Sequence, residues 1–164
     1  KGFVAVQLTF IMKFDDAVSP AWLINLRLIA TAAVVLGHIF PIFADFKGGK
    51  GVATLLGAGT GIYPPLVLLC FAIWCVVFAI WHYVSLASMI AGCCYPIFVM
   101  VFSTTIYDPA APFLSVPFII FSWAVGFMLV WTHRKNIERL RNGTESKIYI
   151  WVKPDEEQSK EKRE

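Results

Sequence analysis

Residues 37–54 read GHIFPIFADFKGGKGVAT, and this stretch separates two apolar parts of the chain. A run of membrane-spanning length ends near His38, a polar loop with two lysines and three glycines follows, and helix-forming residues resume after Gly51. Glycine has no Cβ, so this backbone can take positive φ angles and turn its N–H groups toward one point. Lys47, Lys50 and the start of the next helix add positive charge there. The loop is therefore predicted to hold an anion, most simply a phosphate.

An ordinary cytoplasmic turn and a nucleotide-binding P-loop both fit this loop less well. A polar turn between two spans often carries lysines on the cytoplasmic side, but this explains the lysines and not the glycines around them. A P-loop requires G-x-x-x-x-G-K-[ST] after a buried strand. Here Val52 stands in the wrong register and the preceding element is an apolar helix, so a P-loop is excluded.

The composition is that of an integral membrane protein. Hydrophobic residues make up 58% of the chain, and the 15% that are charged concentrate in the loop and after His133. The net charge is +3 and the basic residues flank apolar runs, so no nucleic-acid partner is expected. Four cysteines lie in apolar segments without a C-x-x-C pair, and histidines and carboxylates do not cluster. Neither a metal nor another cofactor is predicted.

Hydrophobic patterning predicts an all-α fold, a polytopic membrane helix bundle with about six hydrophobic helical segments. These are expected at residues 2–12, 21–41, 52–62, 66–81, 86–102 and 113–131. The first and third are too short to cross a membrane, and the third is rich in small residues that allow close helix packing. Residues 1–150 are expected to form one membrane domain, and residues 151–164 a charged, disordered cytoplasmic tail.

The lysine and arginine distribution predicts the orientation. The central loop carries two lysines and the segment after the last span carries five basic residues, whereas the opposite loops carry mainly aspartates. By the positive-inside rule, the central loop, the turn at His82–Ser85 and the C-terminus face the cytoplasm.

Polar residues at this cytoplasmic side are the candidates for chemistry. His133 and Asn136 lie one helical turn apart and could orient a hydroxyl and handle a proton. Alternatively, they belong to a basic helix lying on anionic lipid head groups. Ser85 and Ser88 stand near a helix start, where serines are most often N-caps. His38, at the end of a span, is more typical of a hydrogen-bonded interfacial residue than of a catalyst. No Ser-His-Asp arrangement with a nucleophile elbow is present.

Three blocks of sequence together resemble one family. GHIFPIFADFKGGKGVAT, then HYVSLAS at 82–88, then HRKNIERLRNGTESK at 133–147 are similar in order and spacing to the bacterial acylphosphate-dependent glycerol-3-phosphate acyltransferase (PlsY) family. The resemblance runs from about Lys1 to Lys147. It implies transfer of an acyl group from acyl phosphate to the 1-hydroxyl of sn-glycerol 3-phosphate, giving lysophosphatidic acid and phosphate. The implied partners are these two substrates and membrane lipids, with no cofactor, and the sequence does not indicate an oligomeric state.

The resemblance also implies which residues form the site. The phosphate-binding residues are expected to be His38, Lys47, Gly48, Gly49, Lys50 and Gly51. The catalytic residues are expected to be Ser85, Ser88, His133, Asn136 and Glu145. Either His133 or a substrate phosphate could take the hydroxyl proton.

The chain departs from the family at its front. The family carries an earlier helix and a loop of the type S-G-N-x-G-A-[TS]-N, and neither is present in these residues. We therefore expect the chain to be N-terminally incomplete, with seven helices in the complete family. We also expect these 164 residues alone to be inactive, because a second phosphate cradle would be missing. The expected location is the bacterial inner membrane, multi-pass, with the site facing the cytoplasm.

Two functions of other classes fit the sequence less well. A transporter or channel for phosphorylated solutes would be expected to show paired broken helices, and only the helix at 52–62 has this character. A non-catalytic membrane subunit would have no need of the His133 and Asn136 spacing.

Overall fold

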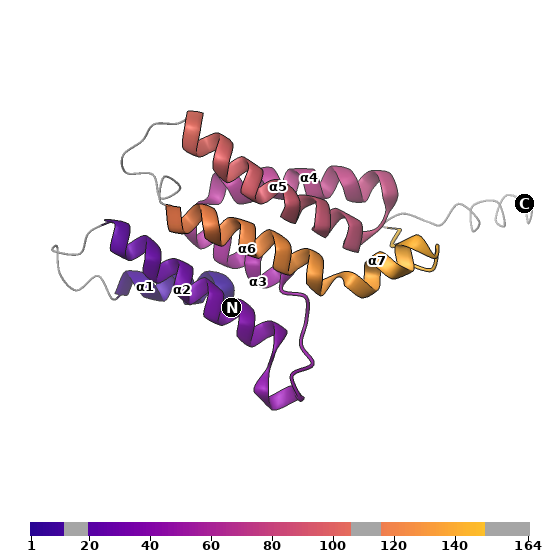
Figure 1. Cartoon of the computed structure of the whole chain (residues 1–164), viewed down its shortest axis with the longest axis horizontal. Coiled ribbons are helices and arrows are strands. Elements are labelled where there is room, and N and C mark those ends of the chain that lie inside the picture. The colour runs from indigo at the N-terminus through magenta and orange to yellow at the C-terminus, as the bar shows by residue number, and fades with distance from the viewer. Residues whose placement is uncertain (12–19, 106–115, 150–164) are drawn as a thin grey trace, which may run out of the picture.

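The structure, a computed structural model, describes residues 1–11, 20–105 and 116–149, and most of these residues are helical. The predicted all-α fold is confirmed (Figure 1). The elements are α1 (Gly2–Ile11), α2 (Pro20–Ile39), the short 3₁₀ helix η1 (Ile42–Ala44), α3 (Val52–Ile62), α4 (Pro64–Trp81), α5 (Val84–Thr105), α6 (Val116–Thr132) and α7 (Arg134–Arg141). The charged tail at 151–164 and most of the polar loops at 13–20 and 103–112 lie outside the described residues.

Three helical stretches among the described residues are long and apolar enough to cross a membrane: Trp22–Ala44, Pro64–Trp81 and Val84–Phe102. A fourth results if α6 and α7, which meet at a bend of 53°, are counted as one span. The predicted number of about six hydrophobic segments is therefore not confirmed. The shortfall comes from α1 and α3, which have 10 and 11 residues where a span needs about 20.

Local residue chemistry sets the helix ends. Gly51, with φ of 85°, is the N-cap of α3, and α4 begins directly after Tyr63 with a proline in its first turn. His82 adopts a left-handed conformation with φ of 59° and ends α4. Because this single residue reverses the chain, α5 starts at Val84. The predicted turn at His82–Ser85 is thus shorter than expected, and Ser85 lies inside α5 and not at its cap.

The five helices α2 to α6 pack in a ring, because each contacts the next and α6 returns to α2. Helix α1 lies outside the ring against α2 and α3. Small residues permit the close approach of α1 and α3: a Cβ on Gly61 would stand 2.9 Å from Val6, and one on Gly57 would stand 3.2 Å from the backbone of Phe3.

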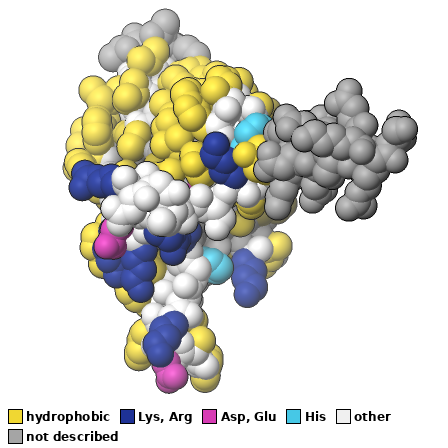
Figure 2. Space-filling view, turned by 90° about the vertical axis from the view of Figure 1, so that its right-hand side faces the viewer, with side chains coloured by type: hydrophobic (Ala, Val, Ile, Leu, Met, Phe, Trp, Pro, Cys, Tyr) yellow, Lys and Arg dark blue, Asp and Glu magenta, His cyan; other side chains and the backbone are white. Residues whose placement is uncertain are grey.

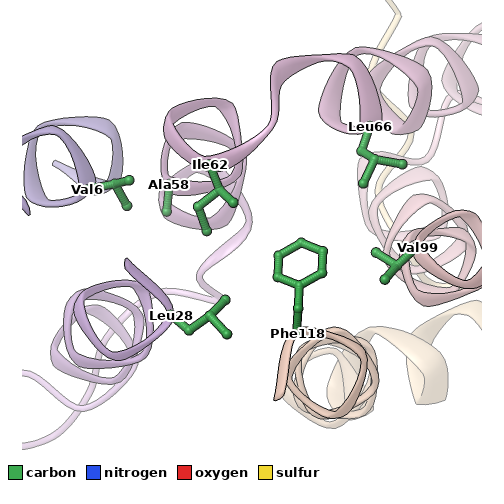
Figure 3. Packing of buried hydrophobic residues seen from close by; sticks show 7 residues of the cluster. All are labelled: Val6, Leu28, Ala58, Ile62, Leu66, Val99 and Phe118. Atoms are coloured by element: carbon green, nitrogen blue, oxygen red, sulfur yellow. The ribbon is translucent and has the colours of Figure 1, made fainter. Parts of the chain in front are cut away.

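A buried apolar cluster closes one end of the ring. Figure 3 shows Phe118 pointing from α6 toward the middle of the cluster, whose other members come from α1 to α5: Val6, Leu28, Ala58, Ile62, Leu66 and Val99. Phe118 stands near the start of α6 and His133 follows its last residue. At 1.5 Å per residue, the cluster and His133 are about 22 Å apart along the helix. The ring therefore has one apolar, filled end and one polar end.

The outer surface suits a lipid environment. Leu68, Ile120 and Phe127 are 65%, 64% and 70% exposed on the outer faces of α4 and α6. Figure 2 looks at the end of the molecule where α2 ends and α7 lies, and there lysines, arginines and histidines gather among hydrophobic side chains. Basic side chains thus gather at this end of a bundle whose outer faces are apolar, which is the pattern of a membrane protein.

Candidate active site

A cavity of about 800 Å³ lies inside the ring and reaches its polar end. Residues from all three sequence blocks line that end: Lys50, Ser85, Ser88, His133, Asn136 and Glu145. The helices bring them together because Lys50 precedes α3, the serines lie in the first turns of α5, and His133 stands at the bend between α6 and α7. The predicted catalytic residues thus form one cluster.

The rest of the cavity wall is mostly apolar. Helix α3 contributes Leu55, α4 contributes Val67 and Phe71, and α6 contributes Val125. Tyr95 of α5 also lines the cavity. A space with a polar mouth and an apolar interior fits a molecule with a charged head and a hydrocarbon chain.

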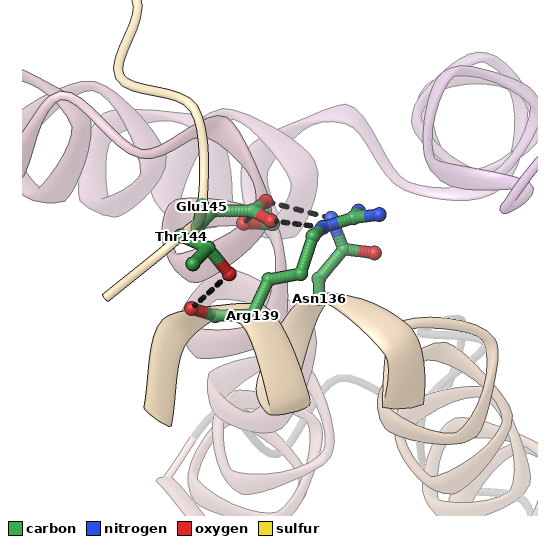
Figure 4. A network of polar contacts seen from close by, with 5 residues as sticks. Asn136, Arg139, Thr144 and Glu145 are labelled. Carbon is green, nitrogen blue, oxygen red and sulfur yellow. Dashed lines mark hydrogen bonds and ion pairs between the residues drawn. The ribbon is translucent and has the colours of Figure 1, made fainter. Parts of the chain in front are cut away.

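Glu145 organises the polar end by accepting hydrogen bonds from α5 and α7, and Figure 4 shows the two from α7, donated by Asn136 and Arg139. Its Oε1 accepts from the Ser85 hydroxyl at 2.5 Å and from Asn136 Nδ2 at 2.7 Å. Its Oε2 accepts from Arg139 Nε at 2.7 Å. The side chain of Glu145 is 9% exposed and that of Arg139 49%. The carboxylate therefore joins the start of α5 to α7.

The environment of Glu145 keeps it ionised. Burial alone would raise the pKa of this carboxyl, but the hydrogen bonds from Ser85, Arg139 and Asn136 outweigh burial and lower the pKa to about 2. A carboxylate with three donors and so low a pKa is a poor proton acceptor. The observed contacts of Glu145 are those of a hydrogen-bond acceptor that holds Ser85 and Asn136.

His133 is buried, with 1% of its surface exposed, and its tautomer follows from its partner. Nδ1 lies 2.8 Å from the Leu129 carbonyl, which can only accept, so Nδ1 carries the proton. In the neutral ring Nε2 then holds the lone pair. Burial lowers the pKa of His133, and the nearby Lys50 cation adds to this, against the opposing effects of the Leu129 bond and Glu145. The net lowering favours a neutral ring that can accept a proton.

Ser88 has a different role from Ser85. Its hydroxyl donates to the Val84 carbonyl at 2.8 Å and accepts from Trp74 Nε1 at 3.1 Å. These bonds tie α4 to α5 in the cavity wall. Neither serine occupies the N-cap of α5, since that helix begins at Val84.

Lys50 is held at the mouth of the cavity by the end of α6. The Thr132 hydroxyl lies 3.3 Å from the Lys50 carbonyl and 2.9 Å from the Leu129 carbonyl, and either can accept its proton. Lys50 therefore brings a cation close to Arg139, Glu145 and His133. Lys47 lines neither this cavity nor the second one described below.

The loop amides bond to η1 and to the end of α2. The N–H groups of Lys47, Gly48 and Gly49 donate to the carbonyls of Ala44, Ile39 and His38, at 2.8, 3.2 and 3.2 Å. In this structure the Gly48 and Gly49 amides of the predicted anion cradle are therefore occupied by backbone carbonyls. The bonds instead satisfy carbonyls that the helix end leaves unpaired. A Cβ on Gly48 would clash with the His38 carbonyl oxygen, so glycine here serves close backbone packing.

Some predicted phosphate residues lie around a second cavity of about 410 Å³. His38, Gly48 and Gly49 line it together with Lys1 and Thr54. Gly51 is buried at the start of α3 and lines neither cavity. The six predicted phosphate residues are thus divided, and only Lys50 belongs to the cavity that holds the catalytic candidates.

Sequence reasoning missed three residues of the site: Arg139, Thr132 and Trp74. Arg139 had a signal, because it follows Asn136 by three positions and so shares its helix face. Trp74 bonds to Ser88, 14 positions away, and Thr132 bonds to Lys50, 82 positions away. Contacts between residues so far apart leave no local pattern in the sequence. Among the residues that the structure describes, no group of three or more histidines, cysteines or carboxylates could hold a metal ion.

Comparison with known proteins matches this chain to one family. The family model described as glycerol-3-phosphate acyltransferase matches residues 1–143. A glycerol-3-phosphate acyltransferase of Burkholderia cenocepacia is 38% identical over 152 residues, covering 90% of this chain and 62% of the relative. One of Gloeobacter violaceus is 37% identical over 148 residues, covering 90% of this chain and 65% of the relative.

Solved structures agree with the sequence matches. The crystal structure of PlsY, an integral membrane glycerol 3-phosphate acyltransferase, in its glycerol 3-phosphate form has a TM-score of 0.69 and 32% identity, covering 90% of this chain and 66% of that one. The lysophosphatidic acid form gives a TM-score of 0.69 and 31% identity, covering 90% and 67%.

The chain spans about two thirds of the length of the curated relatives that it matches, from 62% to 71% in those compared. Within that span, the family match covers α1 to α7 and the residues that line the cavity up to Arg139. The chain belongs to the glycerol-3-phosphate acyltransferase family.

Proposed function

We propose that the protein transfers an acyl group from acyl phosphate to the 1-hydroxyl of sn-glycerol 3-phosphate, forming lysophosphatidic acid and inorganic phosphate. The proposal rests on the larger of the two cavities, which combines cationic residues at one end with a mostly apolar wall. The name of the relatives indicates glycerol 3-phosphate as the acyl acceptor. Two crystal structures of the solved relative are described as its glycerol 3-phosphate form and its lysophosphatidic acid form. Acyl phosphate as the donor rests on the resemblance of the three motif blocks.

The cavity suits both substrates at once. An acyl chain would lie along the apolar wall formed by residues such as Leu55, Phe71 and Val125. The phosphoryl group of the donor would then stand at the mouth, where Lys50 supplies a cation. Arg139 donates through Nε to Glu145 and lines the same mouth, so its other N–H groups can face an anion.

The reaction would proceed by attack of the glycerol oxygen on the acyl carbon. A new C–O ester bond forms, the bond between the acyl carbon and the phosphate oxygen breaks, and phosphate leaves with both electrons of that bond. The hydroxyl proton passes to His133 Nε2, whose lone pair is fixed by the bond from Nδ1 to Leu129. Asn136 and Ser85, both held by Glu145, would orient the acceptor hydroxyl.

The positive-inside distribution supports a cytoplasmic site in the bacterial inner membrane. Lys50 and the basic residues of α7 lie at the same end of the bundle as the cavity mouth. The outer wall of that end carries aromatic residues suited to a membrane interface. Phe40 and Trp131 lie with ring centroids 6.3 Å apart, and the guanidinium of Arg134 stands 4.5 Å from the Trp131 ring.

The test is a transfer assay on the whole protein purified in detergent. Acyl phosphate and glycerol 3-phosphate are supplied, and lysophosphatidic acid and phosphate are measured. We expect equal amounts of the two products and no product with either substrate omitted. Acyl-coenzyme A replaces acyl phosphate in a parallel reaction and is expected to give none. Absence of lysophosphatidic acid from acyl phosphate would overturn the proposal, and uptake of glycerol 3-phosphate into vesicles without turnover would favour a transporter.

A further inference from the structure

The segment from Thr144 to Tyr149, which we call the strap, runs from the end of α7 across the turn between α4 and α5. It is not helical, and Gly143, with φ of 68°, gives the chain the change of direction that starts it. Three residues of the strap contribute to the lining of the main cavity: Glu145, Ser146 and Ile148. The strap thus forms part of the wall beside the catalytic candidates.

Three contacts attach the far part of the strap to the turn. The Ile148 N–H donates to the His82 carbonyl at 2.9 Å. The rings of His82 and Tyr149 lie with centroids 4.9 Å apart, and Lys147 Nζ stands 5.4 Å from the centroid of the Tyr83 ring. None of these contacts involves a predicted catalytic or phosphate-binding residue.

The conformation of His82 makes the attachment possible. His82 ends α4 in a left-handed conformation that is uncommon for a residue with a Cβ, and its own N–H bonds to the Phe78 carbonyl. Its ring meets Phe78 edge-on, with centroids 6.3 Å apart, on one side and Tyr149 on the other. His82 is therefore fixed by α4 and holds the strap through both its carbonyl and its ring.

We infer that His82 and Tyr149 are positioning residues for the transfer reaction, acting through Glu145. Glu145 is three residues from the Ile148 amide, so the attachment restricts where its carboxylate can lie. That carboxylate in turn holds Ser85 and Asn136. Small displacements of groups that orient a reacting hydroxyl are costly in rate. The inference rests on the proposed function for its effect on rate, but the attachment itself can be measured without activity.

The test compares Tyr149→Ala, Tyr149→Phe and His82→Asn in the whole protein. Asparagine tolerates the left-handed conformation, so His82→Asn removes the ring while keeping the turn. Phe127→Ala is the matched control, because it removes a similar aromatic contact, to Trp123, on the lipid-facing side of α6.

The first readout is hydrogen exchange of the strap amides. Tyr149→Ala and His82→Asn are expected to speed exchange at residues 144–149, whereas Tyr149→Phe and Phe127→Ala leave it as in the wild type. Exchange that is unchanged in Tyr149→Ala would overturn the inference, whether or not the wild type transfers acyl groups.

The second readout is the kinetics of transfer. We expect kcat to fall roughly three- to tenfold in Tyr149→Ala and His82→Asn, with the KM for acyl phosphate little changed and recovery in Tyr149→Phe. The double variant should lose little more than either single one, since both remove the same contact. Faster exchange with full kcat would overturn the positioning role, and an inactive wild type would refute the proposed function instead.

Discussion

Lys47 and Lys50 are the same residue type three positions apart, but only Lys50 reaches the cavity. We expect Lys50→Ala to lower kcat/KM for acyl phosphate about tenfold or more, because a charge-assisted contact to phosphate is lost. Lys47→Ala is the matched control and is expected to stay within about twofold of the wild type. Steady-state kinetics with acyl phosphate varied checks both. Equal losses in the two variants would mean that the loop binds the substrate as a whole.

The pH dependence of transfer reports on His133. The neutral ring is the active form, and the pKa of His133 is lowered below the ordinary value of 6.5, chiefly by burial. In the wild type, kcat/KM should rise with pH through that lowered pKa and be level at neutral pH. His133→Gln should lower the rate about a hundredfold and lose this acid limb. The substrates ionise in the same way in assays of the wild type and of His133→Gln. The difference between the two pH profiles of kcat/KM therefore reports the ionisation of His133.

An outcome in which His133→Gln keeps both its rate and the wild-type acid limb would point to a substrate phosphate as the proton acceptor. Circular dichroism and a melting curve belong beside the kinetics. His133 is buried and bonded to Leu129, so a folding defect must be separated from a catalytic one.

At the scale of elements, the loop after α2 depends on how closely its backbone meets that helix. A Cβ on Gly48 would clash with the backbone oxygens of His38 and Ile39, which cannot move without breaking the helix end. A Cβ on Gly49 would meet only the His38 ring, which can rotate away. We expect Gly48→Ala to cost about 1–3 kcal/mol in stability and Gly49→Ala less than about 1 kcal/mol. Thermal unfolding in detergent checks the order, and the reverse order would show that the loop is held differently.

Helix positions followed closely from the sequence, and long-range contacts did not. The run of small residues at 52–62, with Gly51 before it and two prolines after Tyr63, predicted α3 at its observed ends. Such signals are local, because caps and prolines act on their own neighbours. The bonds that Gly48 and Gly49 make to α2 depend on how the loop folds back, so a glycine-rich pattern could equally indicate an open anion cradle.

The same limit applied to the site. Grouping Ser85, His133, Asn136 and Glu145 followed from motif blocks, but the sequence did not reveal that Glu145 joins the other polar groups as an acceptor. The sequence also did not show that Lys50, and not Lys47, lies at the cavity. That difference depends on where the start of α3 lies relative to the end of α6. Roles that depend on the direction of a side chain were open until the helices were placed around the cavity.

At the scale of the whole molecule, the central loop and the strap should face the same side of the membrane. Single cysteines at Lys47, Lys135 and Lys147, which are all exposed, are introduced after the four native cysteines are replaced. A membrane-impermeant thiol reagent applied to oriented vesicles is expected to label all three from the cytoplasmic side. A cysteine at Asp108 is expected to be labelled from the other side. Labelling of Lys47 and Lys147 positions from opposite sides would refute the arrangement.

In the proposed reaction one cavity holds the acyl donor, with its phosphate at Lys50 and its chain between α3, α4, α5 and α6. The most direct measurement is photo-crosslinking with a non-transferable acyl phosphonate that carries a diazirine at the end of its chain, followed by mass spectrometry. We predict labels on inward residues such as Cys70 and Tyr95, removed by excess acyl phosphate. Labelling confined to outward residues of the same wall, such as Leu68, and unaffected by acyl phosphate would show that the acyl chain does not lie in this cavity.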